Sequence, residues 1–225
     1  MKIFKSKHKL QKAIANLESI SFVPTMGGLH QGHISLIKKS KKFKGKNLVS
    51  IFINPKQFNK KKDFLSYPRN FSKDLKILRK LKVDYVYLPK KRDIFSFTPN
   101  KKIYLSGFSK KLCGAYRPGH FKGVLNVVNR FLEIIKPKYL FLGKKDFQQL
   151  YLITSHVLKN EINTQIIPCK SIRGVNGVVY SSRNQNLDKN QLKIASNVYR
   201  YLTKKKKLIK KNLKHYNLID LKNNL

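Results

Sequence analysis

Apolar residues in this chain form two kinds of stretch that alternate along the sequence. Short apolar runs, which predict strands, cover residues 21–24, 48–53, 83–88, 138–142 and 164–168. Stretches with apolar positions three and four apart, the spacing of an amphipathic helix, cover residues 5–18, 71–81, 123–135 and 146–159. Strands that alternate with helices predict an α/β fold, in which a parallel sheet is covered by helices on both faces.

The pattern changes after Asn184. An amphipathic segment covers residues 189–202, a run of lysines covers 204–207, and the remainder is polar. About forty residues are marginal for a core of their own. We therefore predict one domain over residues 1–184 and a small C-terminal segment over residues 185–225.

Charge is the unusual feature of the composition. The chain has 50 Lys plus Arg against 10 Asp plus Glu, a formal net charge of +40. Such a charge would allow non-specific binding to nucleic acid through phosphate contacts. The lysines are spread along the whole chain, however, among abundant Asn, Ile, Phe and Tyr and few Ala. This distribution favours compositional drift over a selected nucleic-acid surface.

Cysteine usage and hydropathy bear on the compartment. Cys113 and Cys169 lie far apart, without the paired spacing of zinc or redox motifs, and isolated cysteines suggest free thiols in a reducing compartment. Lysines interrupt the apolar residues near the N-terminus, and no apolar run approaches the length that spans a bilayer. We predict a cytoplasmic protein without a membrane segment.

Candidate chemistry is densest between Pro24 and His33, where a predicted strand gives way to a helix. Glycines in this segment would let the backbone approach a nucleotide, and a helix N-terminus here favours phosphate. His30 and His33 are three residues apart, so they share a face of the first helical turn. Two imidazoles there can donate to phosphate oxygens as pyrophosphate departs. A bare H-x-G-H is more often an ordinary glycine turn, but the strand before it and the helix after it favour phosphate binding.

Two further candidates follow predicted strands. Asn54 and Gln57 could hydrogen-bond a small polar substrate, and turn capping is an equally good explanation of both amides. Lys145 suits a phosphate group, and Asp146 suits a ribose hydroxyl or, taken alone, a helix N-cap.

Two loops complete the set of candidates. The segment from Tyr180 to Asn184 contains two hydroxyl groups and a guanidinium, which could clamp a phosphate or simply form a turn. The basic loop from Gly114 to Val124 leads into a predicted helix. Its Arg117 could bind a carboxylate, whereas for His120 we favour a structural role.

Taken in order, these segments resemble pantothenate synthetases, members of the H-x-G-H nucleotidyltransferase superfamily. The resemblance covers residues 20 to about 190 and is carried by segments 23–37, 49–58, 67–69, 117–128, 143–150 and 181–184. It implies a Rossmann-like domain that binds ATP and pantoate, Mg²⁺ as cofactor, and a homodimer. It also implies the reaction, in which pantoate is condensed with β-alanine through a pantoyl adenylate and AMP and pyrophosphate are released.

The same resemblance implies a role for individual residues. His30, His33 and Lys145 would be catalytic, with His33 as the conventional acid. The nucleotide would contact Met26, Gly27, Gly28, Leu29, His30, Gln31, Gly32, His33, Gly143, Lys144, Lys145, Asp146, Ile172, Tyr180, Ser181, Ser182 and Arg183. Pantoate and β-alanine would contact Gln57, Gln149, Asn54 and Arg117. Asp74 matches an acidic position near the water shell of Mg²⁺.

The chain departs from the family pattern in three places. Lys144 and Lys73 stand where the family usually has acidic residues, and the second weakens the metal assignment of Asp74. The segment 185–225 is shorter than the domain that normally covers the active site, so we predict only a lid remnant there.

Two alternatives compete with this interpretation. One is another small nucleotidyltransferase, such as a cytidylyltransferase, against which the two glutamines and the 180–184 loop argue. The other is a non-catalytic descendant that binds RNA or acidic partners through its charge. The intact motif residues argue against this second alternative.

Overall fold

The computed structural model of the chain describes residues 1–211. It divides into two compact units, Met1–Ile172 and Arg173–Leu225, and each is described here by itself. The domain boundary that the sequence suggests, at residue 184, stays a prediction. The predicted polar tail lies mostly beyond residue 211, outside the described residues.

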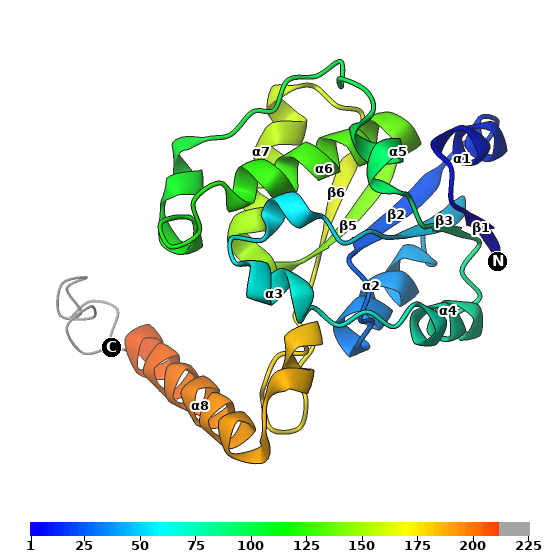
Figure 1. Cartoon of the computed structure of the whole chain (residues 1–225). Coiled ribbons are helices and arrows are strands. Elements are labelled where there is room, and N and C mark those ends of the chain that lie inside the picture. The colour runs from blue at the N-terminus through cyan, green and yellow to red at the C-terminus, as the bar shows by residue number, and fades with distance from the viewer. Residues whose placement is uncertain (212–225) are drawn as a thin grey trace. The chain divides into compact units, whose positions relative to one another are not determined.

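Six parallel strands form the sheet of the first unit, in the order β1-β4-β3-β2-β5-β6 (Figure 1). They are β1 (Lys2–Phe4), β2 (Ile20–Thr25), β3 (Lys46–Ile51), β4 (Tyr85–Tyr87), β5 (Tyr139–Gly143) and β6 (Gln165–Cys169). The five predicted strands are confirmed. The sequence gives no signal for β1 because three residues are too few to show a period.

The strand order changes direction at β2. From β2 the chain adds β3 and β4 on one side, and later β5 and β6 on the other. The segments that follow β2 and β5 therefore leave the same edge of the sheet from adjacent strands. In open α/β sheets this is where ligands bind.

Helices follow most of the strands. The longer ones are α1 (Lys7–Ile14), α2 (Gln31–Ser40), α4 (Phe71–Lys80), α6 (His120–Ile135) and α7 (Phe147–Lys159). Short turns of helix are α3 (Lys61–Leu65), α5 (Lys91–Phe95), η1 (Pro55–Gln57), η2 (Gly107–Lys110), η3 (Leu112–Gly114) and η4 (Lys144–Asp146). None of the described helices is long and apolar enough to cross a bilayer.

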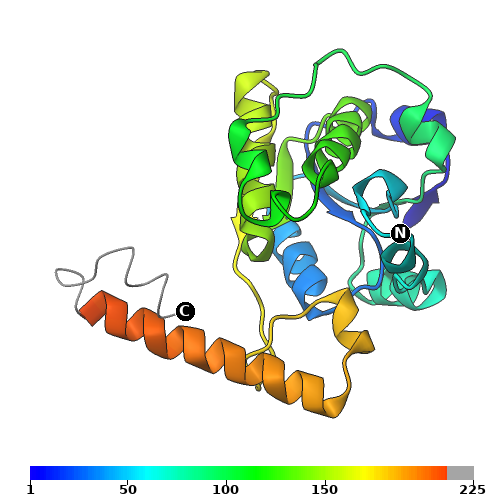
Figure 2. The ribbon, with the colours of Figure 1, turned by 60° about the vertical axis from the view of Figure 1, so that its left-hand side comes forward.

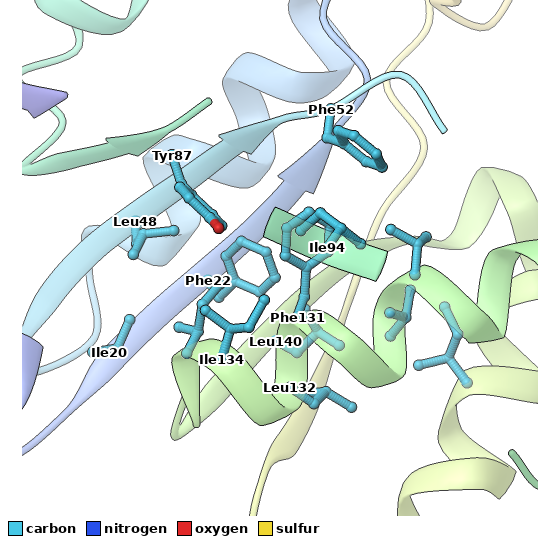
Figure 3. Packing of buried hydrophobic residues seen from close by; sticks show 14 of the residues in the cluster. Ile20, Phe22, Leu48, Phe52, Tyr87, Ile94, Phe131, Leu132, Ile134 and Leu140 are labelled. Atoms are coloured by element: carbon cyan, nitrogen blue, oxygen red, sulfur yellow. The ribbon is translucent and has the colours of Figure 1, made fainter. Parts of the chain in front are cut away.

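Both faces of the sheet are buried, each under its own set of helices. Neighbouring strand residues belong to different cores: Phe22 packs with α1, α5, α6 and α7, whereas Val23 packs with α2 and α4. Leu48 and Val49 divide in the same way in β3. Figure 3 shows the first core, where Phe22 meets Phe131 of α6 edge to face. The prediction of a parallel sheet covered on both faces is confirmed.

The second unit combines a turn with one long helix. Arg173 and Val179 form an antiparallel bridge, followed by η5 (Ser182–Asn186) and by α8 (Lys189–Lys211), the unbroken helix in Figure 2. Ser196 of α8 donates to the carbonyl of Asn176 at 2.6 Å and so ties the helix to the turn. The helix is longer than the predicted segment 189–202.

Candidate active site

The segment after β2 is held in shape by side chains that accept its backbone N–H groups. Gly27 and Gly28 have φ angles of +81° and +61°, which residues other than glycine rarely adopt. Thr25 Oγ1 accepts from the N–H of Gly27 at 3.2 Å. The two carboxylate oxygens of Asp74 accept from Gly28 at 2.9 Å and from Leu29 at 2.8 Å. The N–H groups of these residues, which are predicted to lie against the nucleotide, thus donate hydrogen bonds to side chains of the protein itself.

The histidine pair begins the helix that follows this loop. His30 is the N-cap residue of α2, and its Nδ1 accepts from the N–H of Gly32 at 3.1 Å. Because Nδ1 is the acceptor, the ring proton of His30 lies on Nε2. The rings of His30 and His33 lie with centroids 4.0 Å apart. Within the described part of the chain, the buried Nδ1 of His33 has no hydrogen-bond partner, which suits a ligand that supplies one.

Both imidazoles are neutral at pH 7. Burial, and then the positive charge of Lys145, lowers the pKa of His30 to about 4. Burial, followed by the charges of His30 and Lys145, lowers the pKa of His33 to about 3. Each neutral ring can donate one N–H to a phosphate oxygen, but neither is an imidazolium acid. The acid role that the resemblance implies for His33 therefore requires a bound anion to raise its pKa.

The end of β3 supplies a pair of amides whose orientation is fixed. Asn54 is fully buried and its Oδ1 accepts from the N–H of Lys56 at 3.1 Å. Its Nδ2 therefore faces acceptors, the carbonyl of Gly123 at 3.0 Å and Gln57 Oε1 at 3.3 Å. This leaves Gln57 Nε2 as the donor group, which donates to Met26 Sδ of the β2 loop at 2.7 Å. Asn54 orients Gln57 by these contacts.

Helix α6 packs directly against the backbone that carries Gln57. His120 Nδ1 lies 2.6 Å from the carbonyl oxygen of Gln57. Three residues on, Gly123 faces Lys56 so closely that a Cβ atom there would stand 2.2 Å from the Lys56 carbonyl oxygen. Glycine at this position allows the first turns of α6 to pack directly against the backbone of η1, which follows β3.

The end of β5 brings in Lys145. Its charge lowers the pKa of both histidines, so it lies within their electrostatic reach. Lys145 Nζ is 3.7 Å from Asp146 Oδ2 in an exposed ion pair. Lys144 and Asp146 are exposed, whereas Gly143, the last residue of β5, is half-buried. The charge of Lys145 is thus felt by both imidazoles of the pair.

The two glutamines of α7 have different surroundings. Gln148 is buried, and its Nε2 donates to the carbonyl oxygens of Phe108 at 2.8 Å and Lys111 at 2.6 Å. It fastens the η2 and η3 segment to α7, a role that the sequence analysis missed. Gln149, the predicted substrate ligand, is half-buried.

The remaining predicted residues belong to the turn before α6, to the end of the first unit and to the second unit. Arg117 is half-buried in the turn before α6. Ile172 ends the first unit, and Tyr180 to Arg183 belong to the second. There Ser181 Oγ accepts from the N–H of Arg183 at 3.3 Å and caps η5, and Ser182 is buried.

The described residues do not form a protein-held metal site. Among residues 1–211 no group of three or more His, Cys, Asp or Glu side chains is placed to hold an ion. Asp74, the predicted contact to the water shell of Mg²⁺, is 2% exposed and uses both oxygens for backbone N–H groups. Its surroundings do not fit that role.

Three supporting residues escaped the sequence analysis in full or in part: Asp74 as a loop anchor, Gly123 and Gln148. A glycine inside a helical pattern is a known signal of close backbone approach, and Gly123 carries that signal. The contacts of Asp74 and Gln148 join segments about forty residues apart, so no local pattern marks them.

Comparisons with known proteins show which family and fold this chain resembles. The family model described as Pantoate-beta-alanine ligase matches residues 2–224. The pantothenate synthetase of Francisella tularensis subsp. novicida is 42% identical over 202 residues, 88% of this chain and 76% of that protein. A solved pantoate-beta-alanine ligase from Francisella tularensis, complexed with beta-gamma ATP and beta-alanine, superposes with a TM-score of 0.85 at 42% identity, covering 90% of this chain and 79% of that one. The solved pantothenate synthetase of Thermus thermophilus gives a TM-score of 0.82 at 31% identity, covering 89% of this chain and 72% of that one.

Proposed function

This chain belongs to the pantoate-beta-alanine ligase family, and we propose that the carboxyl ends of β2, β3 and β5 form the site where it ligates pantoate to β-alanine with ATP. The observation that carries the proposal is the His30 and His33 pair at the N-terminus of α2. It lies within reach of Lys145 from β5 and beside the loop that Gln57 contacts from β3.

In the first step the pantoate carboxylate attacks the α-phosphorus of ATP. A bond forms between a carboxylate oxygen and phosphorus, the bond to the bridging oxygen breaks, and pyrophosphate leaves. The protein has little covalent work to do here, because positioning and charge stabilisation lower the barrier. The neutral N–H groups of His30 and His33 donate to phosphate oxygens, and Lys145 supplies the positive charge.

Pantoate is held by amides. The hydrogen bonds of Asn54 fix its amide in one orientation, in which Nδ2 donates to Gln57 Oε1. The other amide group of Gln57, Nε2–H, is therefore a donor, which suits a carboxylate or hydroxyl oxygen of the substrate. Gln149 of α7 is the proposed second amide, and Arg117 is proposed to meet a carboxylate of pantoate or β-alanine. A mixed set of amide and cation donors recognises a small hydroxy acid.

In the second step the amine of β-alanine attacks the carbonyl carbon of the pantoyl adenylate. The new C–N bond forms, the bond between the carbonyl carbon and the phosphate oxygen breaks, the nitrogen gives up one proton to water, and AMP leaves with the electron pair. The adenylate reacts with water as well, so the site must exclude it.

The nucleotide contacts that the resemblance implies outside this cluster remain part of the proposal. Gly143 and Asp146 would hold the ribose, Ser181 to Arg183 the phosphates, and Ile172 and Tyr180 would also contact ATP. Mg²⁺ would enter with the phosphates of ATP, since no side-chain cluster fits it among the described residues. We also propose a homodimer, which light scattering tests.

The decisive experiment is incubation of the chain with ATP, Mg²⁺, pantoate and β-alanine. We expect AMP, pyrophosphate and pantothenate, and no product when pantoate is omitted. With pantoate but without β-alanine, labelled pyrophosphate should exchange into ATP, because the adenylation step is reversible. A folded protein that forms neither pantothenate nor exchanged ATP would overturn the proposal.

A further inference from the structure

The carboxylate of Asp74 contacts the loop that leads into α2, the helix that begins at the histidine pair. Asp74 stands in the first turn of α4 and is 2% exposed. Its Oδ2 accepts from the N–H of Gly28 at 2.9 Å, and its Oδ1 accepts from the N–H of Leu29 at 2.8 Å. Hydrogen bonds from N–H groups to an ionised carboxylate are about twice as strong as neutral ones.

The surroundings of Asp74 are those of a buried anion matched to the backbone. Burial raises the pKa of its carboxyl group, while the hydrogen bonds from Leu29 and Gly28, and then the charge of Lys73, act to lower it. Burial is the larger effect, so the pKa is raised overall, while the geometry is that of a carboxylate whose two oxygens both accept from N–H groups.

The geometry connects this carboxylate to the histidines. Leu29 immediately precedes His30, the N-cap of α2, so fixing the Leu29 amide fixes where the helix begins. His33 follows within the first turn. Gly27 contributes too, because a Cβ atom there would stand 2.9 Å from Asp74 Oδ2. The carboxylate thus occupies the space that a side chain at position 27 would need.

We propose that Asp74 is a positioning residue that holds loop 26–29, and through it the histidine pair, and that it is not part of a Mg²⁺ shell. Its effect on catalysis rests on the proposed function, whereas its effect on the loop does not. A carboxylate that contacts an ion or its water must present a lone pair on the accessible side, and Asp74 is only 2% exposed. In Asp74 both oxygens are engaged, and the adjacent residue is the cation Lys73.

The test is Asp74→Asn. The amide keeps the size of the side chain but retains one acceptor and turns an N–H₂ group toward a backbone N–H. We expect hydrogen exchange of amides 26–33 to accelerate roughly 10-fold or more, as befits a lost hydrogen bond to a charged group. Adenylate formation should fall about 10²-fold through misplacement of the histidines. The Mg²⁺ concentration for half-maximal rate should stay at the wild-type value.

Asp84→Asn is the matched control. Asp84 Oδ2 also accepts from a backbone N–H, that of Asn47 at 3.0 Å, and from the Asn47 side chain at 2.7 Å. Asn47 lies at the start of β3, the sheet edge opposite the site. This variant should lose a comparable pair of bonds and leave both the exchange of amides 26–33 and the rate unchanged.

A metal role would give a different result. If Asp74→Asn raised the Mg²⁺ requirement, if excess Mg²⁺ restored the rate, and if exchange of amides 26–33 stayed at the wild-type value, the proposal would be overturned. Should that variant not fold, Asp74→Glu keeps the charge but overshoots the two N–H groups, so faster exchange is again expected and unchanged exchange refutes the proposal. Exchange is measured without substrates, so wild-type protein that makes no pantothenate would overturn the proposed function alone.

Discussion

Replacing Gly123 with alanine tests whether close packing of α6 against the backbone of Gln57 outweighs the higher helix propensity of alanine. Gly123 lies inside α6, where alanine is favoured over glycine by about 1 kcal/mol. A Cβ atom at this position, however, would stand 2.2 Å from the Lys56 carbonyl oxygen, 2.7 Å from its carbonyl carbon and 3.1 Å from Gln57 Cα. Non-bonded atoms rest at about 3.5 Å, so η1 must move by roughly 1 Å.

The two effects oppose each other, and magnitudes decide between them. The neighbour is backbone rather than a flexible side chain, and overpacking of this kind costs about 1 to 3 kcal/mol. We expect a free energy of unfolding lower by up to about 2 kcal/mol after the propensity gain is subtracted. Moving Gln57 by about 1 Å should lower kcat/KM for pantoate about 10²-fold, while the KM for ATP changes little.

Urea unfolding and AMP release at varied pantoate concentration measure the two quantities. Gly107→Ala is the control, because nothing lies within 4 Å of a Cβ atom at that position. It should leave stability and kinetics close to the wild-type values. The reasoning is refuted if Gly123→Ala is more stable than wild type and uses pantoate equally well.

Three other outcomes are expected. His33→Ala should lower adenylate formation roughly 10²-fold or more with an unchanged circular dichroism spectrum, since one transition-state donor is lost; wild-type turnover would remove His33 from catalysis. Gln57→Ala and Gln149→Ala should each weaken pantoate use by about 1 to 3 kcal/mol, and an equal loss of ATP affinity would place them at the nucleotide instead. The pKa of His33 is lowered from 6.5 to about 3 on folding, so its contribution to stability is complete above pH 6.5 and is lost as the pH falls toward 3. His33→Asn should therefore flatten the decline of the unfolding free energy in that range, and identical pH profiles for the two proteins would contradict the burial of this imidazole.

Local sequence determined much of this protein. Apolar periodicity identifies five of the six strands, and their alternation with helices implies a parallel sheet covered on both faces. The sequence around His30 and His33 suffices to place both imidazoles at a helix N-terminus, because strand, glycines and helix are adjacent in the chain. Periodicity and turn chemistry act over a few residues, and these features do not depend on contacts between residues far apart in the sequence.

Tertiary structure decided which polar groups are available for chemistry. Asp74 meets Gly28 across 46 positions, and Asn54 meets Gly123 across 69, so neither contact leaves a local pattern. The strand order brings the ends of β2 and β5 together and puts Lys145 within electrostatic reach of the histidines. Their neutral state also comes from the fold, since desolvation depends on everything packed around a ring. Sequence alone therefore supplied the candidate residues, and packing determined which of their polar groups are already engaged within the protein.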